Sequence, residues 1–327
     1  MLSHKKTALS DAPSRAQRLA KKGDIFYQTV RPYQKNDYLF DKDAENYVFS
    51  TGYAQIRPKI NGNFLFQLLR TERFVKKVLN ECTGTSYPAI NSKDLSNIKV
   101  SYTNYKEEQR SIGSLLDNLD NLVALQQRKL DRLKEIRKSY LSKIFPNKRE
   151  NRPSLKFNNL KNTSWKPHKL KDIVTNVETG KSKVKLQPKG KYPVLGSTSI
   201  IGYNDHYDYS GDFILIARVG AYAGKMYRFS GSVKITDNTV FIQSAYNTFL
   251  YYYLRNFNLK KLSFGSGQPL VKSSELKSLS ILIPSSKEEI KAISRLSIIF
   301  DNLINVQEKK VSSIRQIKKF LLQNMFT

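Results

Sequence analysis

The sequence predicts an α+β protein with a pseudo-two-fold internal repeat. Two domains of mixed short strands and helices are each followed by a long helix, and the two helices pair as an antiparallel coiled coil. Three observations predict this fold. Residues 84–145 match residues 265–326 at 18 of 62 positions with a constant offset of 181 and no gap. Both copies end in a long stretch with apolar residues at steps of three and four. Strand-like runs precede each copy.

Composition points to a polyanionic partner. The chain of 327 residues has 56 Lys and Arg against 27 Asp and Glu, a net charge of +29, and such an excess favours nucleic acid as the partner. A membrane surface is the second candidate, but no window approaches 18 uninterrupted apolar residues and the start of the chain has no apolar signal core. We therefore expect a soluble, cytoplasmic protein. A single cysteine excludes an internal disulfide framework.

The first domain is predicted to cover residues 1–106. Residues 1–22 are polar and basic and predict a loose or weakly helical lead-in. Strand-like runs follow at 24–30, 46–49 and 54–57, with turn residues between them. Apolar residues at helical spacing then predict one helix over 64–78, packed on the sheet.

Two long helices are the clearest expected elements, at 107–146 and 287–327. A lone helix of this kind would leave its apolar seam in water, so each is the obvious partner of the other. The residues expected to pair the helices are Ile112, Leu119, Gln126 and Leu133 in the first and Ile293, Phe300, Leu303, Gln307, Ile314 and Leu321 in the second. Leu303→Asp is accordingly expected to destabilise the pair. The two glutamines interrupt the seam at equivalent places, and either they fix the register or they turn partly to solvent.

A polar linker is expected at 147–164, and a second domain at 165–286. Strand-like runs with Gly, Asn and Asp turns occur at 192–196, 200–203, 212–217 and 238–242, and a tyrosine-rich helix is predicted from about Asn247 to Phe257. A Gly-Ser-Gly-Gln-Pro loop at 265–269 precedes the second long helix.

Several short stretches in this second half resemble a known family when their order and spacing are taken together. They are Trp165 with Lys169-Leu170-Lys171-Asp172-Ile173, Gly196-Ser197-Thr198, Ile200-Ile201-Gly202-Tyr203, Gly211-Asp212-Phe213-Ile214, Arg218-Val219-Gly220, Gly224-Lys225, Thr239-Val240-Phe241, the 265–269 loop, and Leu321-Leu322-Gln323-Asn324-Met325-Phe326. The chain in this respect resembles the specificity subunit of type I restriction-modification enzymes, over about 23–327.

This resemblance implies a non-catalytic DNA-binding subunit. Each of two target-recognition domains would read one half of a bipartite double-stranded DNA site, and the helix pair would set the spacing. Two methylation (M) subunits would dock on it and move a methyl group from S-adenosylmethionine to adenine, and restriction (R) subunits would add cleavage driven by ATP with Mg. The chain would hold no cofactor of its own.

One departure from the family pattern concerns the first domain. The second domain has 46 residues from Trp165 to Gly211, whereas only 22 precede the equivalent Gly23. The first target-recognition domain is therefore expected to be N-terminally incomplete.

Polar and aromatic side chains in predicted loops are the candidates for DNA contact, because Lys and Arg bind phosphates and amide or guanidinium groups read base edges. The candidates are Arg31, Lys35, Asn36 and Tyr87 in the first domain and Lys181, Lys183, Asn204, His206, Arg218, Tyr222, Lys225, Ser266 and Gln268 in the second.

Signals for catalysis are weak. Gly180-Lys181-Ser182 resembles the end of a phosphate loop, but Thr175 stands where that motif needs glycine, and the three histidines lack metal-ligand spacing. Two other hypotheses stay open. An enzyme acting directly on nucleic acid would show activity with S-adenosylmethionine or Mg²⁺ without partners, and an inactive remnant or recombination cassette would form no complex with a methylation subunit.

Overall fold

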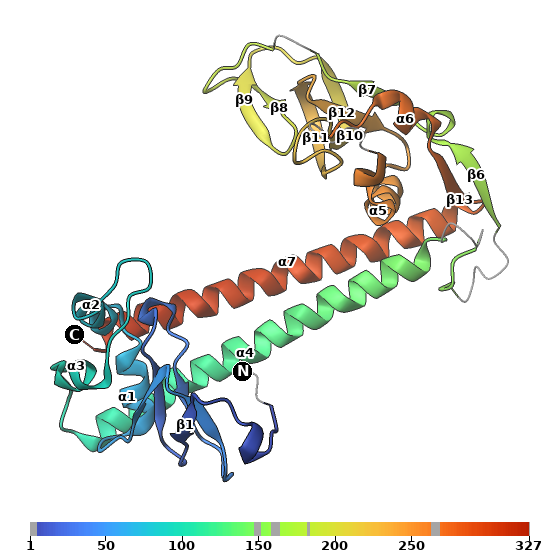
Figure 1. Ribbon diagram of the computed structural model, residues 1–327. Coiled ribbons are helices and arrows are strands. Elements are labelled where there is room, and N and C mark those ends of the chain that lie inside the picture. The colour runs from blue at the N-terminus through green and yellow to red at the C-terminus, as the bar shows by residue number, and fades with distance from the viewer. Residues whose placement is uncertain (1–4, 147–151, 158–163, 182–183, 263–268, 327) are drawn as a thin grey trace. The chain divides into compact units, whose positions relative to one another are not determined.

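The computed structural model describes residues 5–146, 152–157, 164–181, 184–262 and 269–326. The chain divides into two compact units (Figure 1). Unit 1 comprises Met1–Leu130 with Gln307–Thr327, and unit 2 comprises Asp131–Val306. Among the helices described, none is long and apolar enough to cross a membrane.

Unit 1 contains a three-stranded antiparallel sheet in the order β3-β2-β5. Its central strand is buried on both faces, because Ile25 and Tyr27 point into the main core of the unit while Phe26 packs in a second cluster with Phe40. A separate two-stranded sheet is formed by β1 and β4. The strands are β1 (Ala16–Leu19), β2 (Ile25–Gln28), β3 (Tyr38–Leu39), β4 (Val48–Ser50) and β5 (Tyr53–Ile56). The lead-in thus includes a strand, which its polar composition did not predict.

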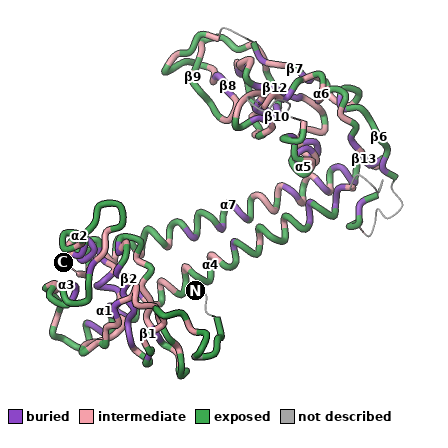
Figure 2. The backbone as a smooth tube through the Cα atoms, in the orientation of Figure 1, coloured by how far each residue is buried: buried purple, intermediate pink, exposed green. Residues whose placement is uncertain are grey.

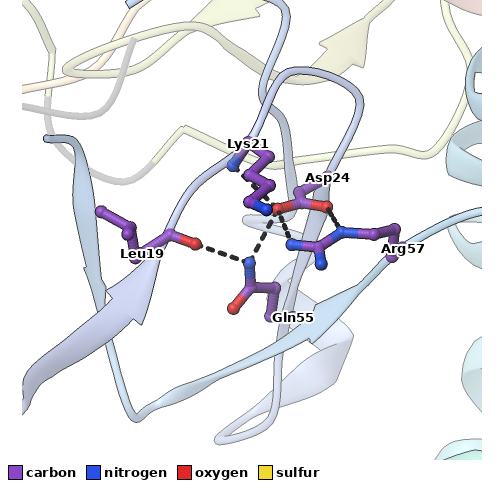
Figure 3. Close-up of polar contacts among 5 residues, drawn as sticks. All are labelled: Leu19, Lys21, Asp24, Gln55 and Arg57. Atoms are coloured by element: carbon purple, nitrogen blue, oxygen red, sulfur yellow. Dashed lines mark hydrogen bonds and ion pairs between the residues drawn. The ribbon is translucent and has the colours of Figure 1, made fainter. Parts of the chain in front are cut away.

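A buried carboxylate fixes the start of β2 (Figure 3). Asp24, with a side chain only 1% exposed, accepts hydrogen bonds from Arg57 Nε (2.8 Å), Gln55 Nε2 (2.7 Å) and the main-chain N–H of Lys21 (2.9 Å). Burial raises the pKa of this carboxyl, but the hydrogen bonds and charge of Arg57 outweigh it and hold the pKa below its usual range. The residue before it, Gly23, has φ of +91°, which favours glycine.

Three short helices cover the sheet of unit 1: α1 (Gly62–Leu69), α2 (Glu72–Asn80) and α3 (Ser92–Asn97). The single helix expected over 64–78 is wrong. The hydroxyl of Thr71 accepts a hydrogen bond from the N–H of Phe74 (3.2 Å) and begins a new helix there. Leu68, Phe74 and Val78 still point into one core, which is why the apolar spacing looked continuous.

Unit 2 is built on a six-stranded sheet in the order β7-β12-β10-β11-β8-β9, in which only β11 and β8 run parallel. Its strands are β7 (Asn176–Thr179), β8 (Tyr192–Leu195), β9 (Ile200–Asn204), β10 (Tyr209–Ala217), β11 (Met226–Ile235) and β12 (Thr239–Gln243). Two further strands, β6 (Trp165–Lys169) and β13 (Ser280–Pro284), pair antiparallel. The helices α5 (Asn247–Phe257) and α6 (Ser273–Ser278) pack on the core of the unit.

The long helices α4 (Lys106–Ile144) and α7 (Lys287–Asn324) contribute to both units. They run antiparallel within each unit, since rising numbers on one helix meet falling numbers on the other. In unit 1, Lys318 pairs with Asp120 and Gln307 with Gln126. In unit 2, Arg137 pairs with Asp301 (2.9 Å). Figure 2 shows that buried, half-buried and exposed residues alternate along both α4 and α7.

Of the ten residues named above as pairing the helices, one lies on the exposed side of its helix. Leu303 is 47% exposed, whereas its neighbour Ile304 is 6% exposed and faces inward, so the expectation that Leu303 pairs the helices is wrong. Among the other expected residues, those that are buried are Ile112, Ile293 and Gln307. Those half-buried are Leu119, Gln126, Leu133, Phe300, Ile314 and Leu321.

The repeat is visible in the elements that follow each sheet. Helix α6 lies at the positions of α3 plus 181, and α7 begins 181 residues after α4. The sheets themselves differ: β2 pairs with β3 and β5 as β10 pairs with β11 and β12, but in the described part of unit 1 no strands flank them as β7, β8 and β9 do in unit 2.

Candidate nucleic-acid interface

In unit 1, two loops far apart in sequence bring Arg31 and Tyr87 together. The guanidinium carbon of Arg31 lies 4.1 Å from the centre of the Tyr87 ring, and the ring is 63% exposed. The N–H of Arg31 donates to the carbonyl of Pro88 (2.8 Å), next to a β-bridge between Val30 and Ala89. A guanidinium stacked on an aromatic face keeps its N–H donors, which lie in its own plane, free for phosphates or base edges.

The other two candidates of unit 1 occupy the same loop. Lys35, with φ of +53°, pairs with Glu72 (2.8 Å), so part of its charge is neutralised. Asn36 is held by its N–H, which donates to Gln28 Oε1 (3.2 Å). Its side-chain amide makes a long hydrogen bond to Gln34 Oε1 (3.4 Å).

Lys35 also borders a basic hollow of about 290 Å³. The charged side chains that line it are Lys35, Arg70, Arg315, Lys318 and Lys319 against Glu72 and Asp120. Burial, and next the charge of Arg70, lower the pKa of Lys318. Five cations against two carboxylates leave a positive surplus suited to phosphate oxygens.

In unit 2, the hairpin loop between β10 and β11 carries Arg218, Tyr222 and Lys225. The ammonium of Lys225 lies 5.1 Å from the centre of the Tyr222 ring, which is 59% exposed. Gly224 has φ of +82°, and a Cβ there would lie 2.8 Å from the N of Lys260. Only glycine can adopt this backbone conformation at such a close approach to Lys260, so Gly224 allows the loop to pack against residue 260.

A neighbouring turn at 236–238 contacts Arg218 and two further polar residues, Ser197 and Lys181. Arg218 donates from Nη1 to the carbonyl of Asp237 (3.0 Å), and the hydroxyl of Ser197 donates to the carbonyl of Asn238 (3.0 Å). Lys181 forms a β-bridge with Thr236. The hairpin and Lys181, which lie 37 residues or more apart, therefore meet at one turn. Ser197, Asp237 and Asn238 were not predicted as candidates for DNA contact. Their residue types are typical of turns and could have indicated a loop at this place.

Asn204 and His206 form a second group at the end of β9. The N–H of His206 donates to Asn204 Oδ1 (3.0 Å), and Asn204 Nδ2 donates to the carbonyl of Lys185 (3.0 Å). Lys181 and Lys234 share the carboxylate of Asp208, each at 3.1 Å. Burial raises the pKa of Asp208, but the two lysines outweigh it and lower that pKa overall. Lys183, Ser266 and Gln268 lie outside the described residues.

The two units hold their loops in the same way. In unit 1 the N–H of Arg31 donates to the carbonyl of Pro88, and in unit 2 the N–H of Gly220 donates to the carbonyl of Pro269 (3.1 Å). The prolines are equivalent in the repeat. Each hydrogen bond ties the loop after a central strand to the segment before a short helix, and each loop presents a cation beside an exposed tyrosine.

The chain was compared with known proteins. The family model described as "Type I restriction modification DNA specificity domain" matches twice, at residues 14–135 and 162–316. The HindI specificity subunit of Haemophilus influenzae is 30% identical over 143 residues, which is 42% of this chain and 31% of that protein. The MjaVIII specificity subunit of Methanocaldococcus jannaschii is 24% identical over 345 positions, covering 94% of this chain and 75% of that protein.

Solved structures show the same fold. The S subunit of a type I restriction-modification system from M. genitalium superposes with a TM-score of 0.67 at 17% identity, covering 94% of this chain and 83% of that one. A structure titled for complex assembly and conformational transition of the type I R-M system gives 0.55 at 19% identity, covering 97% and 85%. With two matches of the family model over most of its length, the chain belongs to the type I restriction-modification DNA specificity family.

Proposed function

We propose that the chain directs a type I restriction-modification complex to a bipartite site on double-stranded DNA. Each recognition domain reads one half, and the paired helices set the spacing between the halves. The observation that carries the proposal is the loop arrangement that both units share. Each loop places a cation beside an exposed tyrosine, Arg31 beside Tyr87 in unit 1 and Lys225 beside Tyr222 in unit 2. Each loop is also held by a main-chain hydrogen bond to an equivalent proline, Pro88 or Pro269. Cations at fixed positions supply phosphate affinity, and rigid loops supply readout of base edges.

We further propose that two methylation subunits dock on the long helices. Large apolar residues stay exposed there at equivalent positions of the repeat, in the pairs Leu122 and Leu303, Leu125 and Val306, and Ile136 and Ile317. Leu122, Leu125 and Ile317 belong to unit 1, and their equivalents belong to unit 2. Equivalent apolar patches fit two copies of one partner.

Catalysis and cofactors are assigned to the partners in this proposal. Methylation subunits would use S-adenosylmethionine on adenine, restriction subunits would use ATP and Mg, and this chain would act in the cytoplasm without a cofactor. Its described residues include no group of three or more His, Cys, Asp or Glu side chains placed to hold a metal ion.

Selection from random duplex DNA tests the assignment of halves. The chain, co-purified with its methylation subunit, is expected to enrich two short specified sequences separated by a fixed unspecified spacer. Arg31→Ala is expected to relax one half only, and Lys225→Ala the other half only, since each changes one loop.

Exposed Lys143, near the end of α4, provides a control, and Lys143→Ala should leave both halves intact. Relaxation of the same half by both loop variants, or enrichment of a single uninterrupted sequence, would contradict the two-domain assignment.

A further inference from the structure

The basic hollow of unit 1 gathers charged side chains from segments that lie far apart in the sequence. Its volume of about 290 Å³ is near the lower end for pockets that hold small ligands. Its cations are Lys35 in the loop after β2, Arg70 at the end of α1, and Arg315, Lys318 and Lys319 on α7. Its carboxylates are Glu72 in α2 and Asp120 in α4. All of these residues belong to unit 1.

Three of the cations are recessed, which is uncommon for lysine and arginine. The exposed fraction of the side chain is 13% for Lys318, 23% for Lys35 and 25% for Arg70. The two carboxylates pair with these three, and the two other cations on α7 add to the surplus, so five positive charges face two negative ones. Burial, and next the charge of Arg70, lower the pKa of the Lys318 ammonium in spite of its pairing, which indicates that the negative charge in the hollow is too small.

The two guanidinium groups of the hollow are held in place. The guanidinium carbon of Arg70 lies 5.0 Å from the centre of the Phe66 ring, and its Nη1 donates to Asp120 Oδ2 (3.1 Å). Arg315 donates from Nη2 to Gln127 Oε1 (3.0 Å). Each of these hydrogen bonds uses one of the five N–H donors of a guanidinium. The others stay in fixed positions, where they can bind an oxyanion through two parallel hydrogen bonds.

The hollow lies on a different side of α7 from the exposed apolar residue Ile317. Arg315 and Lys319 line the hollow and stand two residues before and after Ile317. At 3.6 residues per turn, a step of two residues turns the helix by roughly 200°. The cations therefore point away from the apolar surface proposed for a methylation subunit.

Charge and position indicate the chemistry of the ligand. A surplus of three positive charges is more than one carboxylate neutralises. A phosphate monoester brings about 1.5 to 2 negative charges and three acceptor oxygens, and successive phosphates of a DNA strand bring one charge each. Lys35 belongs to the same loop as Arg31, so the hollow adjoins the candidate DNA-contact loop of unit 1.

We propose that the basic hollow is a phosphate-binding site whose ligand carries at least two negative charges. Arg70 and Arg315 bind the phosphate oxygens through their remaining N–H donors, and Lys319 adds charge at the rim. Two sources share this chemistry: successive phosphates of a DNA strand, and a free phosphorylated compound. The DNA source rests on the proposed function, whereas the site itself does not. A phosphate contact of this kind positions DNA without reading its sequence.

Isothermal titration of the full chain with pyrophosphate tests the site. One pyrophosphate per chain is expected, with a dissociation constant below about 1 mM. Lys319→Gln should weaken binding about fivefold, and Arg315→Gln combined with Lys319→Gln at least about tenfold. Lys319→Arg keeps the charge and should bind within about twofold of the parent chain.

Exposed Lys129 provides the matched control in the same unit. It follows Asp120 by nine residues, or two and a half turns, and so points to the opposite side of α4. Lys129→Gln should leave pyrophosphate binding unchanged. No binding at millimolar pyrophosphate would overturn the proposal. Equal weakening by Lys129→Gln and Lys319→Gln would do so too, because the anion would then bind the basic surface as an adventitious ion only.

Repeating the titration with the chain saturated with duplex DNA distinguishes the sources. Loss of pyrophosphate binding, with a slope of log K against log salt reduced by about 0.9 in Lys319→Gln, assigns the hollow to DNA phosphates. Retention of pyrophosphate binding assigns it to a free phosphorylated compound. A parent chain that binds pyrophosphate but no DNA would contradict the proposed function alone. Lys319→Gln that impairs co-purification with a methylation subunit and leaves pyrophosphate binding unchanged would refute the phosphate site, since carboxylates of a partner would then be the ligand.

Discussion

Gln307 donates a hydrogen bond from Nε2 to the side-chain oxygen of Gln126 (2.9 Å) and another to its main-chain carbonyl (3.0 Å). The two glutamines occupy the same position of the internal repeat. Both glutamines lie in unit 1, so equivalent residues of the two copies meet each other in the antiparallel pairing of α4 and α7. Of the two readings of these glutamines, the hydrogen bonds favour the one in which they fix the register.

The glutamine pair gives the first prediction. Gln307→Leu should lower the free energy of unfolding by about 1–2 kcal/mol, because it leaves the half-buried side-chain oxygen and the main-chain carbonyl of Gln126 without the hydrogen bonds that Gln307 donates. Adding Gln126→Leu should restore much of this loss, since an apolar pair replaces both polar groups. Urea unfolding of the two single variants and the double variant measures the coupling, and additive losses would count against a register pair.

The helix seam gives the second prediction, with adjacent residues as a matched pair. Ile304→Asp should lower the free energy of unfolding by about 3–5 kcal/mol, because it buries a charge in the seam. Leu303→Asp should cost less than about 1 kcal/mol, since that side chain is already exposed. On our proposal Leu303→Asp instead reduces co-purification with a methylation subunit, and equal thermal unfolding of both variants would contradict the assigned seam.

The exposed position of Leu303, which was predicted to pair the helices, shows what the sequence could and could not predict. Apolar spacing predicted the long helices to within a few residues, and the ungapped repeat predicted their pairing. Each helix, however, carries a second apolar stripe, which includes Leu122, Leu125, Leu303 and Val306 on its exposed side. Periodicity cannot tell a stripe that pairs within the chain from one left exposed, because both repeat with the helix turn.

The loops were predicted less completely than the helices. Composition identified Arg31 and Tyr87 separately, but only the fold brings them into contact. Arg218 was predicted as a candidate for DNA contact, and the structure shows in addition that it donates to the carbonyl of Asp237 and helps to hold a turn. A contact between residues some 20 or 60 positions apart depends on sheet order, which has no local signature in the sequence.

Paired ions at equivalent positions give the third prediction. Asp120 pairs with Lys318 in unit 1 as Asp301 pairs with Arg137 in unit 2. Burial raises the pKa of Asp120, but the hydrogen bonds from Lys318 and Gln67 outweigh it and lower the pKa overall. A carboxyl whose pKa is lower in the folded than in the unfolded chain stabilises the fold at any pH above its unfolded pKa, which is near 4. This contribution is lost as the pH falls through the folded pKa.

Asp120→Asn should therefore cost about 1–3 kcal/mol at pH 7 and progressively less below about pH 4, as measured by urea unfolding at several pH values. Asp117 is the control, since burial and the nearby charge of Asp120 raise its pKa. Asp117→Asn should stabilise unit 1 at pH 7, and this gain should fade on acidification. The same sign for both variants would contradict the assigned electrostatics.

A buried carboxyl in the candidate DNA-contact loop gives the fourth prediction. Burial raises the pKa of Asp37 to about 6, against an opposing hydrogen bond from the N–H of Gln28 (2.8 Å). A raised folded pKa penalises the ionised form, so stability falls as the pH rises from about 4 to about 6. Asp37→Asn should therefore stabilise unit 1 at pH 7.5 but not at pH 4, and an equal effect at both would contradict the shift.

Salt dependence gives the last prediction, and two lysines of unit 2 form its matched pair. DNA binding by a chain of charge +29 should weaken steeply with salt, because each phosphate contact releases a counterion. Lys225→Gln should reduce the slope of log K against log salt by about 0.9 if the ammonium contacts a phosphate. Lys181→Gln should change the slope less, since Asp208 already neutralises part of that charge at 3.1 Å. Fluorescence anisotropy over a salt series with one duplex measures both slopes. A larger effect of Lys181→Gln would indicate that the DNA phosphates lie near Lys181 and Asp208 rather than near Lys225, and would contradict the prediction.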